Sequence, residues 1–257
     1  MRLETLLPAK VVLPEVGQAM QRGNPALAAA TVAAVLESTE QIDTARRVEL
    51  LIQGAVAARL AGHQEQAQQW ARDSVMLSAD VDPQTVALAL GLAVFADAPQ
   101  SQEDALALAQ RIESALVDIS TESVAAFSRY AAVVAYILGG DTAAAREALN
   151  RLQALPAARG LWIAGRSQVC AAVIDYLEAS PAGVASTLDL LQPFTLSAGD
   201  AIPLASMWWD MAELWHRLGN DEAAWTAAVR ALDASGVRPA DGHSSFAPGV
   251  LTWDMSI

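Results

Sequence analysis

The sequence predicts an all-α protein, an α-solenoid in which about six antiparallel helix pairs stack one on the next. Hydrophobic residues make up 53% of the 257 residues and aromatic residues only 5%, and alanine, the best helix former, supplies most of the surplus. Valine and isoleucine never form the alternating runs that are typical of strands, and hairpin turn signals are almost absent. A repeat of nearly constant period, the third observation, groups the helices into pairs.

Each of six repeats has a short polar turn, often with glycine, followed four or five positions later by an alanine. These alanines lie 39, 38, 40, 40 and 39 residues apart, at Ala28, Ala67, Ala105, Ala145, Ala185 and Ala224. Apolar residues recur at helical spacing between the turns. The pattern predicts twelve helices, over residues 14–22, 25–38, 41–61, 63–78, 83–96, 101–118, 121–138, 141–153, 157–178, 181–192, 202–218 and 220–235. Stacked pairs of this kind bury a continuous core and expose a concave and a convex face.

The residues of the turns suit the ends of helices. Glycine readily adopts the left-handed conformation that ends a helix, and Asn24, Asp141 and Asn220 are positioned to cap the helix that follows. Ser101 and Asp104 form an acidic variant of the capping box.

The last repeat has a more specific pattern, in which a large aromatic residue, a hydrophobic–small pair, a second aromatic residue, a turn and small residues follow in order. It reads Trp208-x-x-Met211-Ala212-x-x-Trp215-x-x-x-Gly219-Asn220-Asp221-Glu222-Ala223-Ala224-x-x-x-Ala228-x-x-Ala231-Leu232. This spacing resembles the tetratricopeptide repeat consensus, and the resemblance extends over about residues 14–236. It implies a right-handed superhelix whose concave groove is lined by the first helix of each pair.

The repeat period of this chain exceeds the usual tetratricopeptide length of about 34 residues. The period, and the sequence from Ala212 to Pro239, resemble the helical sensor domain of bacterial transcription regulators of the maltose-regulon activator type. That resemblance implies ligand sensing and transcription regulation. The DNA-binding helix-turn-helix of such regulators is recognisable neither in residues 1–24 nor after Arg238.

The net charge and the cysteine content of the chain limit which kinds of partner we expect it to bind and in which cell compartment we expect it. The formal net charge is −13 and Lys10 is the only lysine, which argues against direct binding of nucleic acid or of an anionic membrane. The longest apolar run, residues 131–138, is too short to span a bilayer, and the N-terminus lacks the apolar stretch of a signal peptide, so we expect a cytoplasmic protein. The single cysteine, Cys170, excludes an internal disulfide and a cysteine-based zinc site.

The resemblance to tetratricopeptide repeats also implies which side chains line the concave groove. In the sixth repeat these are Ser206, Trp209, Glu213 and His216, whereas Trp208, Met211 and Trp215 become packing residues of the same helix. The other candidates are Phe127, Tyr130 and Val134 in the fourth repeat and Arg59 in the second. Two alternatives stay open: Trp209 packs against a neighbouring helix or the tail, and the first helices are apolar all round because they are buried.

No pattern in the sequence indicates catalysis, a metal or a cofactor. Glu213-x-x-His216 has the spacing of an iron-ligating pair, but such a site needs a second pair, and the chain has only three histidines. Asp241, His243 and Ser244 adjoin in one loop, which does not make a catalytic triad. Cys170 lies among apolar helical residues, which favours a role as a small core residue.

The chain is predicted to form one solenoid over residues 1–238 and a non-helical tail over residues 239–257. The tail contains Phe246, Leu251, Trp253, Met255 and Ile257 and is too apolar for a solvated segment. We expect it to fold back as a cap, over the last helix pair or into the groove, with Trp253 as its main anchor.

These observations predict a non-catalytic binding module, a regulatory sensor or adaptor. Its concave groove would hold a peptide, a protein segment or a small apolar ligand. The alternative is a structural subunit or inhibitor that docks onto a larger assembly through its acidic surface.

Overall fold

Every element in the described part of the chain is helical. A computed structural model describes residues 13–38, 42–97, 99–159, 161–180, 182–184, 186, 207–209, 211–212, 215–216 and 219–235. The helices are α2 (Pro14–Gln21), α3 (Pro25–Ser38), α4 (Thr44–Leu60), α5 (Gln64–Leu77), α6 (Pro83–Ala96), α7 (Gln102–Ala115), α8 (Glu122–Leu138), α9 (Thr142–Gln153), α10 (Leu161–Leu177) and α13 (Asp221–Ser235). Short 3₁₀ turns follow α5, α7 and α9 as η1 (Ser78–Asp80), η2 (Leu116–Asp118) and η3 (Pro156–Arg159). The predicted all-α class is confirmed over these residues, and none of these helices is long and apolar enough to cross a membrane.

The helix boundaries agree with the prediction to within a few residues wherever a whole helix is described. Two predicted helices, over residues 181–192 and 202–218, lie mostly outside the described residues, and so does the tail over residues 239–257. The chain divides into two compact units, Met1–Ala135 and Tyr136–Ile257, and α8 runs across the division. The single solenoid predicted over residues 1–238 stays a prediction.

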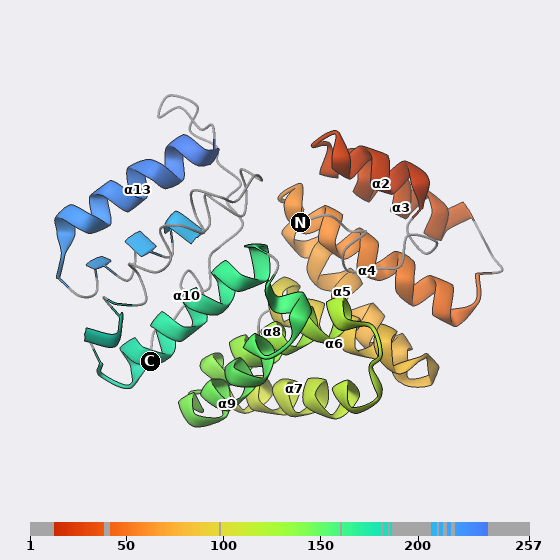
Figure 1. Cartoon of the computed structure of the whole chain (residues 1–257). Coiled ribbons are helices and arrows are strands. Elements are labelled where there is room, and N and C mark those ends of the chain that lie inside the picture. Colours follow the sequence, from red (N-terminus) through yellow and green to blue (C-terminus); the bar gives the residue numbers. More distant parts are fainter. Residues whose placement is uncertain are drawn as a thin grey trace. The chain divides into compact units, whose positions relative to one another are not determined.

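In the first unit, consecutive helices pack against one another from α2 to α7 (Figure 1). Helix α4 also packs against α6, so the first helices of successive pairs are in contact as well as the helices of one pair. In the second unit, α9 packs against α10. The helices approach closely because the repeat alanines Ala28, Ala67, Ala105 and Ala145 have no exposed surface.

Five turns between helices have the same backbone structure. The residue before the cap has a positive φ angle in each, at Gly23, Gly62, Gly140, Ala179 and Gly219. The next residue donates its N–H to the carbonyl five positions earlier, a Schellman bond of 2.8–3.0 Å, from Asn24, His63, Asp141, Ser180 and Asn220. The turns of five of the six repeats therefore share this helix ending.

The predicted caps are present at the start of the next helix. Asn24 Oδ1 accepts the backbone N–H of Leu27 at 3.0 Å, and Asp141 and Asn220 make the equivalent bonds at 2.9 and 3.1 Å. Ser101 Oγ accepts the N–H of Asp104 at 3.1 Å and donates to the carboxylate of Asp104 at 2.8 Å. Each bond satisfies an N–H that the helix itself leaves without a partner.

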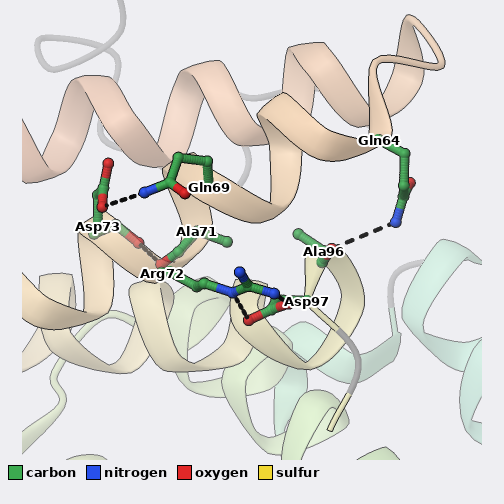
Figure 2. A network of polar contacts seen from close by, with 8 residues as sticks. Gln64, Gln69, Ala71, Arg72, Asp73, Ala96 and Asp97 are labelled. Atoms are coloured by element: carbon green, nitrogen blue, oxygen red, sulfur yellow. Dashed lines mark hydrogen bonds and ion pairs between the residues drawn. The ribbon is translucent and has the colours of Figure 1, made fainter. Parts of the chain in front are cut away.

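Polar side chains tie the end of α6 to the preceding helix pair. Figure 2 shows Arg72 of α5 reaching Asp97, with which it makes two hydrogen bonds of 2.6 Å. The hydrogen bonds to Asp97 raise the pKa of Arg72, and the negative charge of that carboxylate raises it further. Gln64 Nε2 donates to the carbonyl of Ala96 at 3.5 Å, and Arg59 donates to the carbonyl of Phe95 (Gln64 and Ala96 are labelled in Figure 2). Cationic side chains are favourable here because the carbonyl end of a helix carries partial negative charge.

The alanine at the turn before Ser180 predicts a stabilising substitution. Ala179 adopts a φ of 54°, where the other four turns have glycine. We expect Ala179→Gly to raise the free energy of unfolding by about 0.5–1 kcal/mol, because glycine has no Cβ to strain this conformation but loses more backbone entropy on folding. Chemical denaturation of both proteins measures the difference.

Gly23→Ala is the matched control, because a Cβ added at Gly23 would meet no atom within 4 Å. Its only cost is therefore the positive φ of 70°, and it should destabilise by a similar amount. A neutral or destabilising Ala179→Gly would contradict the prediction.

Candidate functional site

The predicted groove residues of α8 are buried in the first unit. Phe127, Tyr130 and Val134 each expose less than 5% of their surface. The ring of Phe95 in α6 lies 5.8 Å from that of Phe127 and 5.3 Å from that of Tyr130, between ring centroids. These side chains thus form an aromatic contact between α6 and α8, and their contact with a ligand stays a prediction.

Arg59, the groove candidate of the second repeat, is half-buried at the end of α4. Its guanidinium donates to the carbonyl of Phe95, whose ring belongs to the aromatic contact with α8. Arg59 therefore helps to hold the last turn of α6, and binding of a partner by Arg59 is untested.

The candidates of the sixth repeat are only partly described. Ser206 and Glu213 lie outside the described residues, and Trp209 is half-buried. His216 is exposed, and its Nδ1 lies 2.9 Å from Asp221 Oδ1 at the start of α13. The structure therefore shows His216 beside Asp221, whereas the predicted group of Trp209, Glu213 and His216 stays a prediction.

The packing residues predicted for the same helix are described in more detail. Trp208 and Met211 are buried as predicted, and Trp215 is half-buried. The guanidinium of Arg230 in α13 lies 4.7 Å from the ring centroid of Trp208, a cation–π contact. Trp208 therefore connects its helix to α13.

The residues considered for chemistry do not assemble into a site within the described ranges. Among those residues, no group of three or more His, Cys, Asp or Glu side chains is placed to hold a metal ion. Cys170 is fully buried in α10, which confirms it as a core residue. Asp241, His243 and Ser244 lie outside the described residues.

Within the described residues, a depression on the surface of the first unit is a candidate for binding. It has a volume of about 470 Å³ and is open to solvent, and α3, α4 and α5 line it. Its apolar residues are Leu36, Leu51, Trp70, Met76 and Leu77, and its charged residues are Glu37, Arg47 and Asp73. A volume of this size falls in the range of ligand-binding clefts, which are mostly apolar with a few polar groups.

The exposed apolar side chains of the depression come from the end of α5. Met76 has 77% of its surface exposed and Leu77 has 37%. The buried side of α5 is formed by Ala67, Ala71 and Ser74, and Met76 lies outside this stripe. Met76 therefore does not serve the packing of α5 on its neighbours.

A glycine of α4 fixes the position of the Trp70 ring. A Cβ added at Gly54 would lie 2.6 and 2.7 Å from two carbon atoms of that ring and 2.9 Å from a methyl group of Val32 in α3. The ring therefore lies directly on the backbone of α4, next to α3. Only glycine at position 54 leaves room for this wall of the depression.

No protein-family model, curated protein or solved structure matches this chain. The proposed function therefore rests on the structure of the depression itself.

The sequence reasoning missed this site because it searched the first helix of each pair. Trp70, Met76 and Leu77 are on α5, the second helix of its pair. One signal was available, since Met76 lies near the end of the helix and away from the stripe that begins with the repeat alanine Ala67.

Replacing Gly54 with alanine tests the position of Trp70. A substitution that overpacks a core lowers the free energy of unfolding by about 1–3 kcal/mol. Alanine is preferred over glycine inside a helix, which offsets up to about 1 kcal/mol of this loss. We expect Gly54→Ala to lower the free energy of unfolding by about 1–2 kcal/mol and to change the tryptophan fluorescence of the folded protein.

Gly91→Ala in α6 is a graded control. Its Cβ would meet Phe127 at 3.1 Å, a milder approach than that at Gly54. We expect a change in stability smaller than that of Gly54→Ala, in either direction. Equal stability of Gly54→Ala and the unmodified protein would show that the Trp70 ring does not rest on α4.

Proposed function

We propose that this protein is a non-catalytic binding module that receives an apolar segment of a partner protein in the depression between α3, α4 and α5. The observation that supports the proposal best is Met76, which is 77% exposed at the edge of a depression that Trp70 also lines. Tryptophan is among the residues that most often dominate binding energy, and methionine adapts to differently shaped partners. Covering these side chains removes apolar surface from water, which is the main driving force of association.

The charges around the depression indicate the chemistry of the partner. Two of its three charged residues, Glu37 and Asp73, are acidic, and the whole chain carries a net charge of −13. Lysine or arginine on the partner is therefore attracted to this surface, whereas an acidic partner is repelled. Arg47, also at the depression, offers one position for an acidic group. The partner segment is accordingly an amphipathic helix with an apolar side and basic flanks.

The binding mode is helix-in-groove recognition, in which one apolar side of a partner helix is buried. It requires no catalytic group and no cofactor. The role of regulatory sensor or adaptor belongs to the same proposal, because a bound segment favours whichever arrangement of α3, α4 and α5 contacts it best. The proposal places the contact on these helices and not on α8, since Phe127, Tyr130 and Val134 are buried.

The negative charge of the chain supports a second proposal, a subunit or inhibitor that docks onto a basic partner through its acidic surface. The two proposals differ in their dependence on salt. At about 0.5 M salt, contacts between exposed charges are largely screened, whereas burial of apolar side chains is not weakened. Partner binding that survives such salt favours the depression, and binding that is abolished favours the acidic surface.

Met76→Glu distinguishes the two proposals without affecting the fold. The probe is a synthetic amphipathic peptide of leucine and lysine whose leucines repeat at helical spacing. If the depression binds it, a carboxylate in place of Met76 removes the apolar contact, and we expect Kd to rise at least tenfold, or about 1.4 kcal/mol. If the acidic surface binds it, the added negative charge leaves Kd unchanged or lowers it. Fluorescence anisotropy of a labelled peptide measures Kd.

Val117→Glu in η2 is the matched control. Val117 is 80% exposed, as apolar as Met76, and does not line the depression. It adds the same charge to the same unit, so we expect little change in Kd. Equal Kd values for Met76→Glu, Val117→Glu and the unmodified protein would rule out the depression as the binding site.

A further inference from the structure

The last described helix, α13, carries two apolar side chains on its surface. Trp225 is 73% exposed and Val229 is 38% exposed. They are four residues apart, so they lie on the same side of the helix. Exposure of a whole tryptophan ring is costly, because this side chain buries more apolar surface than almost any other. We call this pair the terminal face.

The positions of this pair in the repeat have a defined role in earlier repeats. Arg146, one residue after the repeat alanine Ala145, donates to Asp175 and Glu178 near the end of α10 at 2.6 Å each. Partial burial disfavours the charged form of Arg146, but the hydrogen bonds to Glu178 and Asp175 outweigh this and raise its pKa. In this repeat, the position one residue after the repeat alanine therefore faces the end of the next helix.

The position five residues after the repeat alanine has the same role in α5. Arg72 follows Ala67 by five residues, and its guanidinium binds Asp97 at the end of α6 (Figure 2). In both repeats, a side chain of the second helix thus contacts the carbonyl end of the helix that follows.

Trp225 and Val229 occupy these two positions of α13, one and five residues after Ala224. At the first position, Ala29 is buried, Gln68, Leu106 and Arg146 are half-buried, and Ser186 of the fifth repeat is exposed. Trp225 is the one large apolar side chain among the described members of this series that is exposed. The terminal face therefore lies at the repeat positions where Arg72 and Arg146 contact the helix that follows. Its side chains are apolar, whereas those of Arg72 and Arg146 are charged.

We propose that the terminal face is the docking site of the chain's own C-terminal segment, residues 246–257. This segment contains Phe246, Leu251, Trp253, Met255 and Ile257, and the last four alternate with other residues. In an extended conformation, alternating residues lie on one side of the chain, which suits an apolar strip. The terminal face is apolar, and so is the segment that follows it in the sequence.

The chain is long enough for this contact. Ten residues of helix separate Trp225 from Ser235, a distance of about 15 Å along α13. The eighteen residues from 236 to 253 span up to roughly 60 Å when extended. Trp253 therefore reaches Trp225 with chain to spare.

The chain's own segment is a better occupant than a second copy. Linkage through residues 236–245 gives the segment an effective concentration of the order of millimolar at α13. A stable dimer, by contrast, generally buries about 1,200 Å² or more in total. Two exposed apolar side chains provide much less than that.

A double-mutant cycle in the full-length protein tests the contact. Trp225→Ala and Trp253→Ala each remove one side of it, and we expect each to lower Tm by about 2–4 °C. Because both substitutions remove the same contact, we expect the Tm of the double variant to lie within about 1 °C of the Tm of the less stable single variant. Losses that add up in the double variant, or no loss in Trp225→Ala, would overturn the proposal.

A pair of valine substitutions provides the matched control. Val229→Ala lies on the terminal face, and we expect it to lower Tm in the unmodified protein but not in the Trp253→Ala background. Val117→Ala removes the same atoms from a side chain that is 80% exposed and outside the face, and should leave Tm unchanged in both backgrounds. Tm is measured at two protein concentrations. A loss of Tm in Trp225→Ala that depends on concentration would indicate a second copy on α13 and would reject the chain's own segment.

Discussion

The close approach of neighbouring helices depends on an alanine that each second helix presents near its start. Ala28, Ala67, Ala105 and Ala145 have no accessible surface, so a larger side chain at any of them would push the helices apart. The turns before Ala28 and Ala145 end the first helix with a Schellman bond and start the second with a side-chain cap. Turn and alanine together fix where one helix ends and where the next begins to pack, and the remaining contacts are built on that spacing.

This dependence explains which features the sequence predicted well. Glycine at Gly23, Gly62, Gly140 and Gly219 and a cap residue after most of them are local requirements of a left-handed helix ending, so helix boundaries followed from them. The turn at Ala179 followed from the repeat period, which predicts a turn shortly before Ala185, although a positive φ is unusual for alanine. Burial of Phe127, Tyr130 and Val134 was harder to predict, because an apolar residue on a first helix suits a groove and a core equally well.

The candidate site could not be predicted from the sequence for a related reason. Trp70 lines the depression only because Gly54, sixteen residues earlier on another helix, leaves room for its ring. A glycine inside a helix normally weakens it, and the sequence alone does not tell which side chain occupies the space it leaves. Exposure of Met76 is likewise a property of the packed unit, because α5 buries Ala67, Ala71 and Ser74 and leaves Met76 on the outside. Helical periodicity identifies such residues as lying off the stripe, but not as neighbours of Trp70.

Arg146 and Arg72, which lie one and five residues after their repeat alanines, each contact the end of the helix that follows their own. Arg146 is half-buried between carboxylates and Arg72 is held by two bonds to Asp97, so each needs an acidic partner at the end of the next helix. Tryptophan and valine at the same positions of α13 form neither contact, and they gain only from an apolar cover. An apolar segment cannot replace the acidic partner of an arginine, because an unpaired charge is costly to bury. An acidic helix end likewise cannot replace an apolar cover, because an apolar ring donates no hydrogen bond to a carboxylate. At these two positions, Arg146 and Arg72 thus suit an acidic helix end, whereas Trp225 and Val229 suit an apolar segment.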